Sequence, residues 1–339
     1  MKGNILSAFQ DYFPKIIEII NEYLRPRTVD FVLEHVNKLV NYSLKGGKNV
    51  RGTLAASTYL ELTGFSPSDN FAQVGYILGW SIELLQAAYL VADDLMDQSE
   101  TRRGQKCWYL LDGIGNSATN DALLVENLVF VLINYLRERF LDDETVDEII
   151  SIFRYISTIT TIGQTYDSKA ESFTLDCYKI IVENKTAYYT FWLPISVSMI
   201  ASQKLPKGKY NDKSFTQFML DIGYFFQSQD DYLDVYCDEV TTGKKGTDII
   251  DRKVTWFSCK AYELGNESQK EAIMKVYENP DQRYEAVMKV YEDLGLKQLF
   301  ENYSDKEYEK LSKELKELDP VFPKNTLSEL LGSLMKRNK

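Results

Sequence analysis

Hydrophobic residues recur along most of this chain at intervals of three and four positions, the period of an α-helix with one apolar face. The pattern predicts helices at 13–24, 122–140 and 145–159. Sustained alternation of apolar and polar residues, which would predict strands, is scarce. Residues 76–92 are apolar around most of the helix circumference, which is typical of a central helix wrapped by others. The pattern therefore predicts one large all-α bundle.

Short breaks rich in glycine, proline and polar residues separate these helices. They fall at 44–52, 63–70, 111–116, 203–212, 241–248 and 278–282. The chain of 339 residues has no long linker, low-complexity tract or repeat, and its eight prolines leave room for long helices. We expect a single domain over residues 1–339.

Composition narrows the class of protein. Hydrophobic residues make up 44% of the chain, and its net charge of −11 makes it a poor binder of nucleic acid or anionic membranes. The N-terminal segment lacks a signal-peptide pattern, and the longest unbroken apolar run is too short to span a bilayer. Four scattered cysteines show no zinc spacing and predict reduced thiols. We therefore expect a cytoplasmic protein without membrane insertion.

Two acidic clusters with the same spacing end apolar helices. The first is Asp93, Asp94 and Asp97, and the second is Asp230, Asp231 and Asp234. On a helix, the first and third aspartates of each cluster lie one turn apart on the same face. Buried carboxylates are costly unless cations compensate them, and carboxylates suit Mg²⁺ that bridges to substrate phosphates. One such cluster could equally be a solvated face or a helix start. Its repetition favours two facing metal sites.

Basic residues accompany both clusters. They are Arg102 and Arg103 after the first cluster, Lys244 and Lys253 after the second, Lys185, and Lys48 with Arg51 in a glycine-rich loop. Each alone is typical of a protein surface. Near a metal cluster, fixed cations can hold a diphosphate and stabilise it as it leaves. The only histidine, His35, lies on an amphipathic helix and is expected to be structural.

The segments "GGKNVRG", "DDLMDQSETRRGQKCWY" and "FFQSQDDYLD…TGKKGTDI…KVTW" resemble all-trans isoprenyl diphosphate synthases, above all eukaryotic farnesyl diphosphate synthases. The resemblance covers nearly the whole chain. It implies an all-α fold of the isoprenoid synthase (class I terpenoid synthase) type with a central cavity. It also implies a homodimer, a small-molecule prenyl diphosphate substrate, and three Mg²⁺ ions with bound diphosphate.

The resemblance further implies a role for individual residues. Asp93, Asp97 and Asp230 would bind the metal, supported by Asp94, Asp231 and Asp234. The allylic diphosphate would contact Arg102, Gln164, Asp167, Lys185, Lys244 and Lys253. Catalysis would use Asp230, Lys185, Thr186, Gln227 and Lys244. The isopentenyl site would comprise Lys48, Val50, Arg51, Gln86, Arg103 and Arg337. The cavity wall would include Ala88, Tyr89, Tyr189 and Phe226.

Several positions depart from the farnesyl diphosphate synthase pattern. Val50 replaces the asparagine of GGKxNRG, and Ala88 with Tyr89 replaces two aromatic residues of the cavity floor. The segment "YDSKAES" replaces DLLTA and keeps only Asp167, while Ser228 and Cys237 are also unusual. These changes cluster around the elongation pocket and the second-substrate site.

The departures favour a terpene synthase like those that insects derived from farnesyl diphosphate synthases. Such an enzyme would convert (2E,6E)-farnesyl diphosphate into a terpene hydrocarbon or alcohol plus diphosphate. The alternative is a chain-elongating prenyltransferase, a farnesyl or geranylgeranyl diphosphate synthase that condenses an allylic diphosphate with isopentenyl diphosphate. The retained basic residues of the isopentenyl site favour it, and the pocket deepened by Ala88 would allow the longer product. A third possibility, a non-catalytic partner subunit, is disfavoured because both aspartate motifs are complete.

Overall fold

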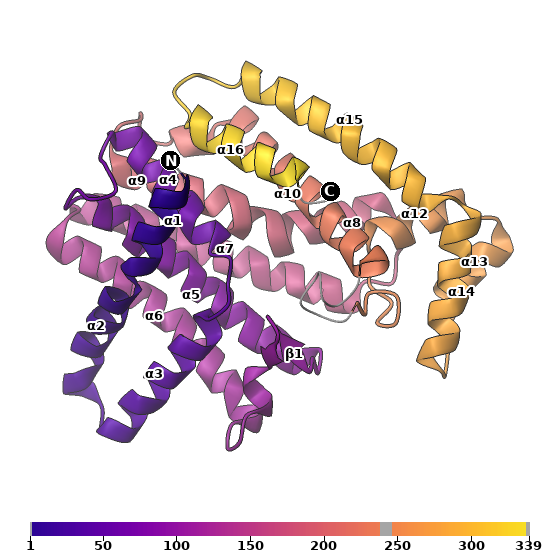
Figure 1. Ribbon diagram of the computed structural model, residues 1–339, viewed down its shortest axis with the longest axis horizontal. Helices are drawn as coiled ribbons and strands as arrows, with labels where there is room; N and C mark the ends of the chain where they lie inside the picture. Colours follow the sequence, from indigo (N-terminus) through magenta and orange to yellow (C-terminus); the bar gives the residue numbers. More distant parts are fainter. Residues whose placement is uncertain (1, 238–245, 337–339) are drawn as a thin grey trace. The chain divides into compact units, whose positions relative to one another are not determined.

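The structure is a computed structural model that describes residues 2–237 and 246–336, and its regular structure is almost entirely helical (Figure 1). Within those two ranges the only strands are β1 (Thr101–Arg102) and β2 (Gln105–Lys106), which pair as a short antiparallel hairpin. The predicted all-α class is confirmed. Backbone contacts divide the chain into two compact units, Met1–Arg154 with Leu193–Asp212 and Tyr155–Trp192 with Lys213–Lys339. The expected single domain stays a prediction.

The first unit contains the N-terminal helices and one later helix. They are α1 (Lys2–Asp11), α2 (Phe13–Leu24), α3 (Asp30–Leu44), α4 (Val50–Thr63), α5 (Ala72–Met96), α6 (Ala118–Arg139), the start of α7 (Asp143–Lys169) and α9 (Leu193–Ser202). Four short 3-10 turns connect them: η1 (Arg25–Arg27), η2 (Trp108–Leu110), η3 (Gly115–Ser117) and η5 (Lys209–Asn211).

Helix α5 forms the core of the first unit, packed against α4 and α6. Its length and composition would allow it to cross a membrane, but 83% of its most apolar window is buried inside the structure. Burial of that kind is typical of the central helix of a globular protein, so the predicted central helix is confirmed. Trp80 of α5 stacks on Phe9 of α1 with ring centroids 4.5 Å apart, which ties the N-terminal helix to this core.

The second unit contains the remaining helices. They are the end of α7, α8 (Leu175–Val182), the π-helical segment η4 (Glu183–Trp192), α10 (Lys213–Tyr236), α12 (Trp256–Leu264), α13 (Glu267–Met274), α14 (Pro280–Asp293), α15 (Leu296–Glu317) and α16 (Lys324–Met335). Helix α10 packs against η4 and α15, and α15 in turn packs against α16 (Figure 1). Aromatic rings fill much of the core of this unit. The ring centroid of Phe257, for example, lies 5.4 Å from that of Phe300 and 5.9 Å from that of Tyr291.

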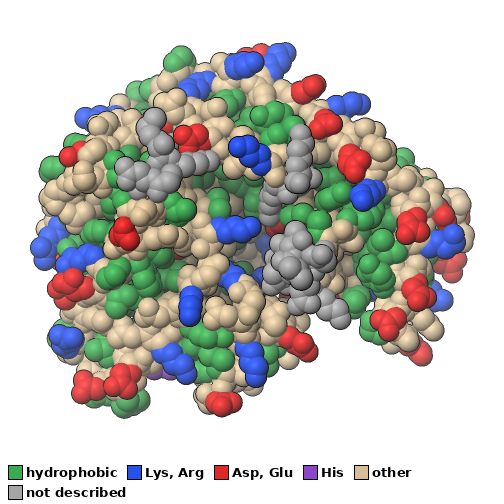
Figure 2. Space-filling model, viewed as in Figure 1, with side chains coloured by type: hydrophobic (Ala, Val, Ile, Leu, Met, Phe, Trp, Pro, Cys, Tyr) green, Lys and Arg blue, Asp and Glu red, His purple; other side chains and the backbone are tan. Residues whose placement is uncertain are grey.

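The structure shows where the charged side chains and the cysteines lie. The face seen in Figure 2 carries both acidic and basic side chains spread over it. All four cysteines lie in the described part of the chain, and all are free thiols. His35 bonds the buried carboxylate of Asp121 at 2.8 Å, which is a structural contact between α3 and α6.

Candidate active site

The first aspartate motif lies where α5 ends and the β1–β2 hairpin begins. Positive φ angles at Arg103 (53°) and Gly104 (71°) turn the chain back at this point. The turn allows Arg102 to donate from Nε and Nη2 to Oδ1 of Asp94, at 2.9 and 2.5 Å. The buried carboxylate of Asp94 is therefore ion-paired with Arg102 of the hairpin.

The other two aspartates of this motif are more exposed. Asp93 is half-buried and Asp97 is exposed, whereas Asp94 is only 4% exposed. Burial alone would lower the pKa of Arg102, but the hydrogen bonds and charge of Asp94 outweigh it and raise that pKa. Arg102 therefore stays charged beside Asp93, whose Oδ2 lies 3.8 Å from Nη2.

The glycine-rich loop before α4 packs on Arg103. A Cβ atom added to Gly47 would lie 2.9 Å from Nη1 of Arg103, so the loop backbone lies against the guanidinium. The same Nη1 donates to the carbonyl oxygen of Ser43 at 3.1 Å. The loop carries Lys48, which is exposed, and leads into Arg51, which is half-buried. The first unit thus gathers basic residues from two separate segments of sequence.

Val50 is the first residue of α4, and 42% of its surface is exposed. The preceding Asn49 adopts a left-handed backbone (φ 50°) and is buried, and its Oδ1 accepts a hydrogen bond from Nε2 of Gln10 at 3.1 Å. The amide of Asn49 therefore bonds α1 and does not substitute for the missing asparagine at position 50. On α5, Gln86 and Tyr89 are half-buried and Ala88 is buried.

In the second aspartate motif, as in the first, the middle aspartate is buried and the outer two are more exposed. Asp231 is 2% exposed. Its Oδ2 accepts a hydrogen bond from the backbone N–H of Trp256 at 2.8 Å, and its Oδ1 accepts one from Nε2 of Gln227 at 3.0 Å. Burial raises the pKa of Asp231 to about 7, although both hydrogen bonds act in the opposite direction. Asp230 and Asp234 are half-buried. In both motifs the middle aspartate is thus held by the protein itself.

Two lysines share one carboxylate in the second unit. Oδ2 of Asp167 accepts hydrogen bonds from Nζ of Lys185 at 2.6 Å and from Nζ of Lys253 at 3.0 Å. Burial would raise the pKa of Asp167, but the charges and hydrogen bonds of the two lysines outweigh it and lower that pKa. Two ammonium groups on one carboxylate leave this cluster with a net positive charge. Gln164 is half-buried and precedes Asp167 on α7.

Lys185 and Thr186 belong to the π-helical segment η4. Oγ1 of Thr186 donates to Oε1 of Gln227 on α10 at 3.1 Å. Departures from α-helical geometry of this kind are frequent at functional sites, because they redirect side chains. Tyr189 and Phe226 are half-buried, and Phe226 packs edge-on against Phe191 at 5.2 Å.

Two glycines allow η4 to lie in backbone contact with its neighbours. A Cβ on Gly163 of α7 would lie 2.3 Å from the backbone nitrogen of Lys185. A Cβ on Gly223 of α10 would lie 2.2 Å from Cβ of Ala187. One helical turn after each glycine comes a residue that bonds a side chain of η4. Asp167 follows Gly163 and bonds Lys185, and Gln227 follows Gly223 and bonds Thr186. Sequence analysis did not predict these glycines, although each is an isolated glycine inside a helical pattern.

Some predicted residues and contacts stay untested. Lys244 and Arg337 lie outside the described residues. The two aspartate motifs belong to different units, so that they face each other stays a prediction.

The oxygen ligands of the motifs fit a hard cation such as Mg²⁺. Within residues 2–237 and 246–336, no three His, Cys, Asp or Glu side chains gather closely enough to hold a metal ion by themselves. Mg²⁺ commonly keeps several waters and binds one or two carboxylates together with substrate phosphates. The pairs Asp93 with Asp97 and Asp230 with Asp234 suit that mode of binding.

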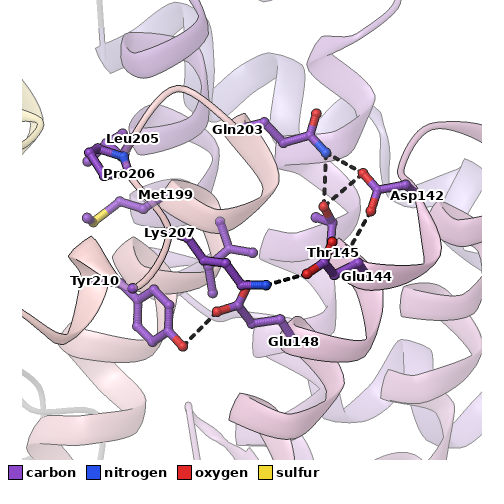
Figure 3. Close-up of a pocket in the computed structure, with 12 residues that line it drawn as sticks. Asp142, Glu144, Thr145, Glu148, Met199, Gln203, Leu205, Pro206, Lys207 and Tyr210 are labelled. Atoms are coloured by element: carbon purple, nitrogen blue, oxygen red, sulfur yellow. Dashed lines mark hydrogen bonds and ion pairs between the residues drawn. The ribbon is translucent and has the colours of Figure 1, made fainter.

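A pocket of about 340 Å³ lies elsewhere in the first unit, between the start of α7 and the segment after α9 (Figure 3). Its polar side chains already bond one another. Gln203 donates to Asp142, Lys207 pairs with Glu144, and Tyr210 donates to Glu148. None of the predicted site residues lines this pocket, which is therefore not a candidate for the catalytic site.

Comparison with known proteins identifies the family. The family model described as polyprenyl synthetase matches residues 33–294. The chain belongs to the polyprenyl synthetase family. The farnesyl pyrophosphate synthase of Candida albicans is 33% identical over 100% of this chain and 98% of its own length. That of the insect Murgantia histrionica is 34% identical over 98% of this chain and 82% of its own length. The structure of T. brucei farnesyl diphosphate synthase complexed with minodronate matches with a TM-score of 0.90 and 26% identity, over 99% of this chain and 100% of that one.

The match confirms the isoprenoid synthase fold and shows that this polyprenyl synthetase is an enzyme, a trans-prenyltransferase. Members of the family use Mg²⁺.

The preference for a terpene synthase is wrong. Relatives along the whole chain, insect ones included, are named farnesyl pyrophosphate synthases, which are chain-elongating prenyltransferases. The error came from giving most weight to Val50 and the "YDSKAES" segment. The structure shows that Val50 projects from the start of α4 with 42% of its surface exposed, while the basic loop around it keeps its packing on Arg103.

Proposed function

We propose that this enzyme elongates prenyl diphosphates by condensing an allylic diphosphate with isopentenyl diphosphate, with farnesyl diphosphate as the product. The C1–O bond of the allylic substrate breaks and diphosphate leaves. A carbon–carbon bond then forms between C1 and the terminal alkene carbon of isopentenyl diphosphate. A proton lost from the new chain restores the double bond, and the departed diphosphate can accept it.

The observation that carries this proposal is the presence of two distinct basic groups. Lys185 and Lys253 gather on Asp167 in one unit. The loop of Lys48 and Arg51 packs on Arg103 in the other unit. A condensation needs to bind two diphosphates, whereas a reaction on one prenyl diphosphate needs only one such group. The names of the full-length relatives support the same conclusion.

We assign the allylic diphosphate to Lys185, Lys253 and Arg102, with Lys244 as a further contact. Ammonium and guanidinium groups that are fixed before the reaction stabilise the charge that develops on the leaving diphosphate. Asp167 holds the two lysines together and limits their mutual repulsion. When bound, Mg²⁺ supplies further positive charge to the same leaving group.

We assign the metal to Asp93, Asp97 and Asp230, with Asp234 nearby, because these carboxylates are the more exposed members of their motifs. Asp94 and Asp231 instead orient the motifs through Arg102 and Trp256. The expected number of three Mg²⁺ ions belongs to this proposal. We assign Thr186 and Gln227 to the catalytic group because Thr186 follows Lys185 directly and Gln227 joins Thr186 to Asp231 of the second motif.

The test is a paired assay of the purified protein with Mg²⁺ and geranyl diphosphate, with and without isopentenyl diphosphate. We expect farnesyl diphosphate only when both substrates are present. Chromatography of the diphosphates also distinguishes a longer product, which the small Ala88 side chain would allow. Absence of any elongated diphosphate would refute the proposal.

Val50→Asn provides a second test. Because Val50 is exposed and the basic loop is intact, restoring the asparagine is expected to change the KM for isopentenyl diphosphate by less than about tenfold, near the upper end of what a single neutral hydrogen bond contributes. A large gain in elongation by this variant would show that the wild-type site is impaired.

The predicted homodimer is also a proposal. Light scattering coupled to size-exclusion chromatography would test it, and a mass equal to one chain would exclude it.

A further inference from the structure

A buried glutamate that has no part in the roles above lies beside the start of α4. Glu83 of α5 is 2% exposed, and its Oε1 accepts the backbone N–H of Gly52 at 2.8 Å. Gly52 is the third residue of α4, so its N–H group has no partner within its own helix. The carboxylate therefore caps α4 from a neighbouring helix. A carboxylate is also favourable at the positive end of the helix dipole, which offsets the cost of burying it.

The contact is made possible by two helices whose backbones touch. A Cβ on Gly79 of α5 would lie 2.5 Å from the carbonyl oxygen of Gly52. A Cβ on Gly52 would lie 2.4 Å from Cζ of Phe9 and 2.9 Å from Cγ of Glu83. The start of α4 is thus enclosed by α5 and α1, and Glu83 is in direct contact with the backbone of α4 at Gly52.

The same short stretch carries the basic residues assigned to isopentenyl diphosphate. Arg51 directly precedes Gly52, and Lys48 lies one residue before Asn49. Asn49 is the other anchor of this stretch, because its side chain accepts the hydrogen bond from Gln10. A buried charged contact at Gly52 and a neutral contact at Asn49 therefore flank the position of Arg51.

We propose that Glu83 is a positioning residue for the second substrate. By holding the N–H of Gly52, it sets the direction of Arg51 and Lys48 toward isopentenyl diphosphate without touching the substrate itself. This inference rests on the proposed function. It predicts that changes at Glu83 weaken binding of isopentenyl diphosphate much more than binding of the allylic substrate.

The experiment compares Glu83→Gln, Glu83→Asp and Glu83→Ala in the full chain. Gln keeps an oxygen at the same reach, whereas Asp keeps the charge but is one methylene too short. We expect Glu83→Asp and Glu83→Ala to raise the KM for isopentenyl diphosphate about tenfold or more, as for loss of a hydrogen bond to a charged group. Glu83→Gln should raise it less than either of these variants does, because a neutral hydrogen bond remains.

The readouts separate positioning from general stability. The KM for the allylic diphosphate should stay within about twofold, well below the tenfold change that a lost charged hydrogen bond produces. Calorimetric binding of isopentenyl diphosphate should show the same order of variants. Ser81→Ala is the matched control, since Ser81 is buried on the same helix and its Oγ donates to the carbonyl oxygen of Ile77 on that helix. Its two KM values should match the wild type.

Each outcome decides the question. Equal changes in both KM values, or an unchanged KM for isopentenyl diphosphate in Glu83→Asp, would overturn the role of Glu83. If Glu83→Ala does not fold, the comparison of Asp with Gln still decides. If the wild type fails to incorporate isopentenyl diphosphate, the proposed function fails. If it elongates but the variants do not separate the two KM values, only this inference fails.

Discussion

Gly223→Ala is the substitution for which the structure predicts the clearest effect on catalysis. The added methyl carbon would lie 2.2 Å from Cβ of Ala187, whereas non-bonded carbons prefer about 3.5–4.0 Å. Helix α10 and η4 must therefore separate by roughly 1 Å or more at this point. Such overpacking typically costs about 1–3 kcal/mol of stability.

The separation should also break a contact within the site. The hydrogen bond from Thr186 to Gln227 is 3.1 Å long, so a further 1 Å would exceed the length of a hydrogen bond. Displacements of that size in a catalytic site can lower the rate about 100-fold. We expect Gly223→Ala to lower kcat by about this factor while the protein remains folded.

The assay is steady-state elongation together with thermal unfolding of the same preparations. Gly332→Ala is the matched control, because Gly332 lies on α16 and an added Cβ there meets no atom within 4 Å. It should keep full activity and gain about 0.4–1 kcal/mol of stability.

A paired exchange tests the cause. Combining Gly223→Ala with Ala187→Gly removes the contact between the two Cβ atoms but leaves the new Cβ 2.7 Å from Cα of residue 187. Activity should recover only in part. Unchanged kcat in Gly223→Ala alone would refute the argument that backbone contact between α10 and η4 positions Thr186.

Three further predictions concern charge and metal. Asp167→Asn should lower the free energy of unfolding by about 2 kcal/mol at pH 7, because it weakens both lysine contacts. The lowered pKa of Asp167 means that its stabilising effect is present above the ordinary aspartate pKa and is lost as pH falls, so urea unfolding below about pH 4 should show a smaller difference. Arg102→Lys keeps the charge but loses the paired hydrogen bonds to Asp94, and the KM for the allylic diphosphate should rise about tenfold in steady-state assays. Chelation of divalent ions should abolish elongation, and added Mg²⁺ should restore it, while circular dichroism stays unchanged because apolar cores hold the helices.

Comparison of the sequence with the structure shows which inferences can be drawn from local pattern. The predicted helix at 13–24 is α2 with the same bounds, and 122–140 lies within α6 apart from its last residue. Periodicity succeeds here because the side chains that share a face are only a turn apart. The motifs also identified the family, since their residues lie close together in sequence.

The substitutions at Val50 and Ala88 were harder to interpret. Sequence shows that a residue type has changed, but the effect depends on where the side chain points. Val50 is exposed at a helix start, while the neighbouring Asn49 is buried against α1. The change at Val50, which suggested a lost substrate site, therefore leaves the basic loop intact. The amino-acid sequence alone does not show which of the two side chains, Asn49 or Val50, is buried.

By itself, the sequence determined the helical class, the acidic motifs with their basic companions and the family. Only the tertiary structure decided which aspartate of each motif is buried as a support, which carboxylate joins Lys185 to Lys253, and that Glu83 caps α4. The physical reason is the separation along the sequence of the residues that interact. Helical periodicity arises between residues three or four apart, whereas Lys253 reaches Asp167 across 86 positions through packing that no short pattern encodes.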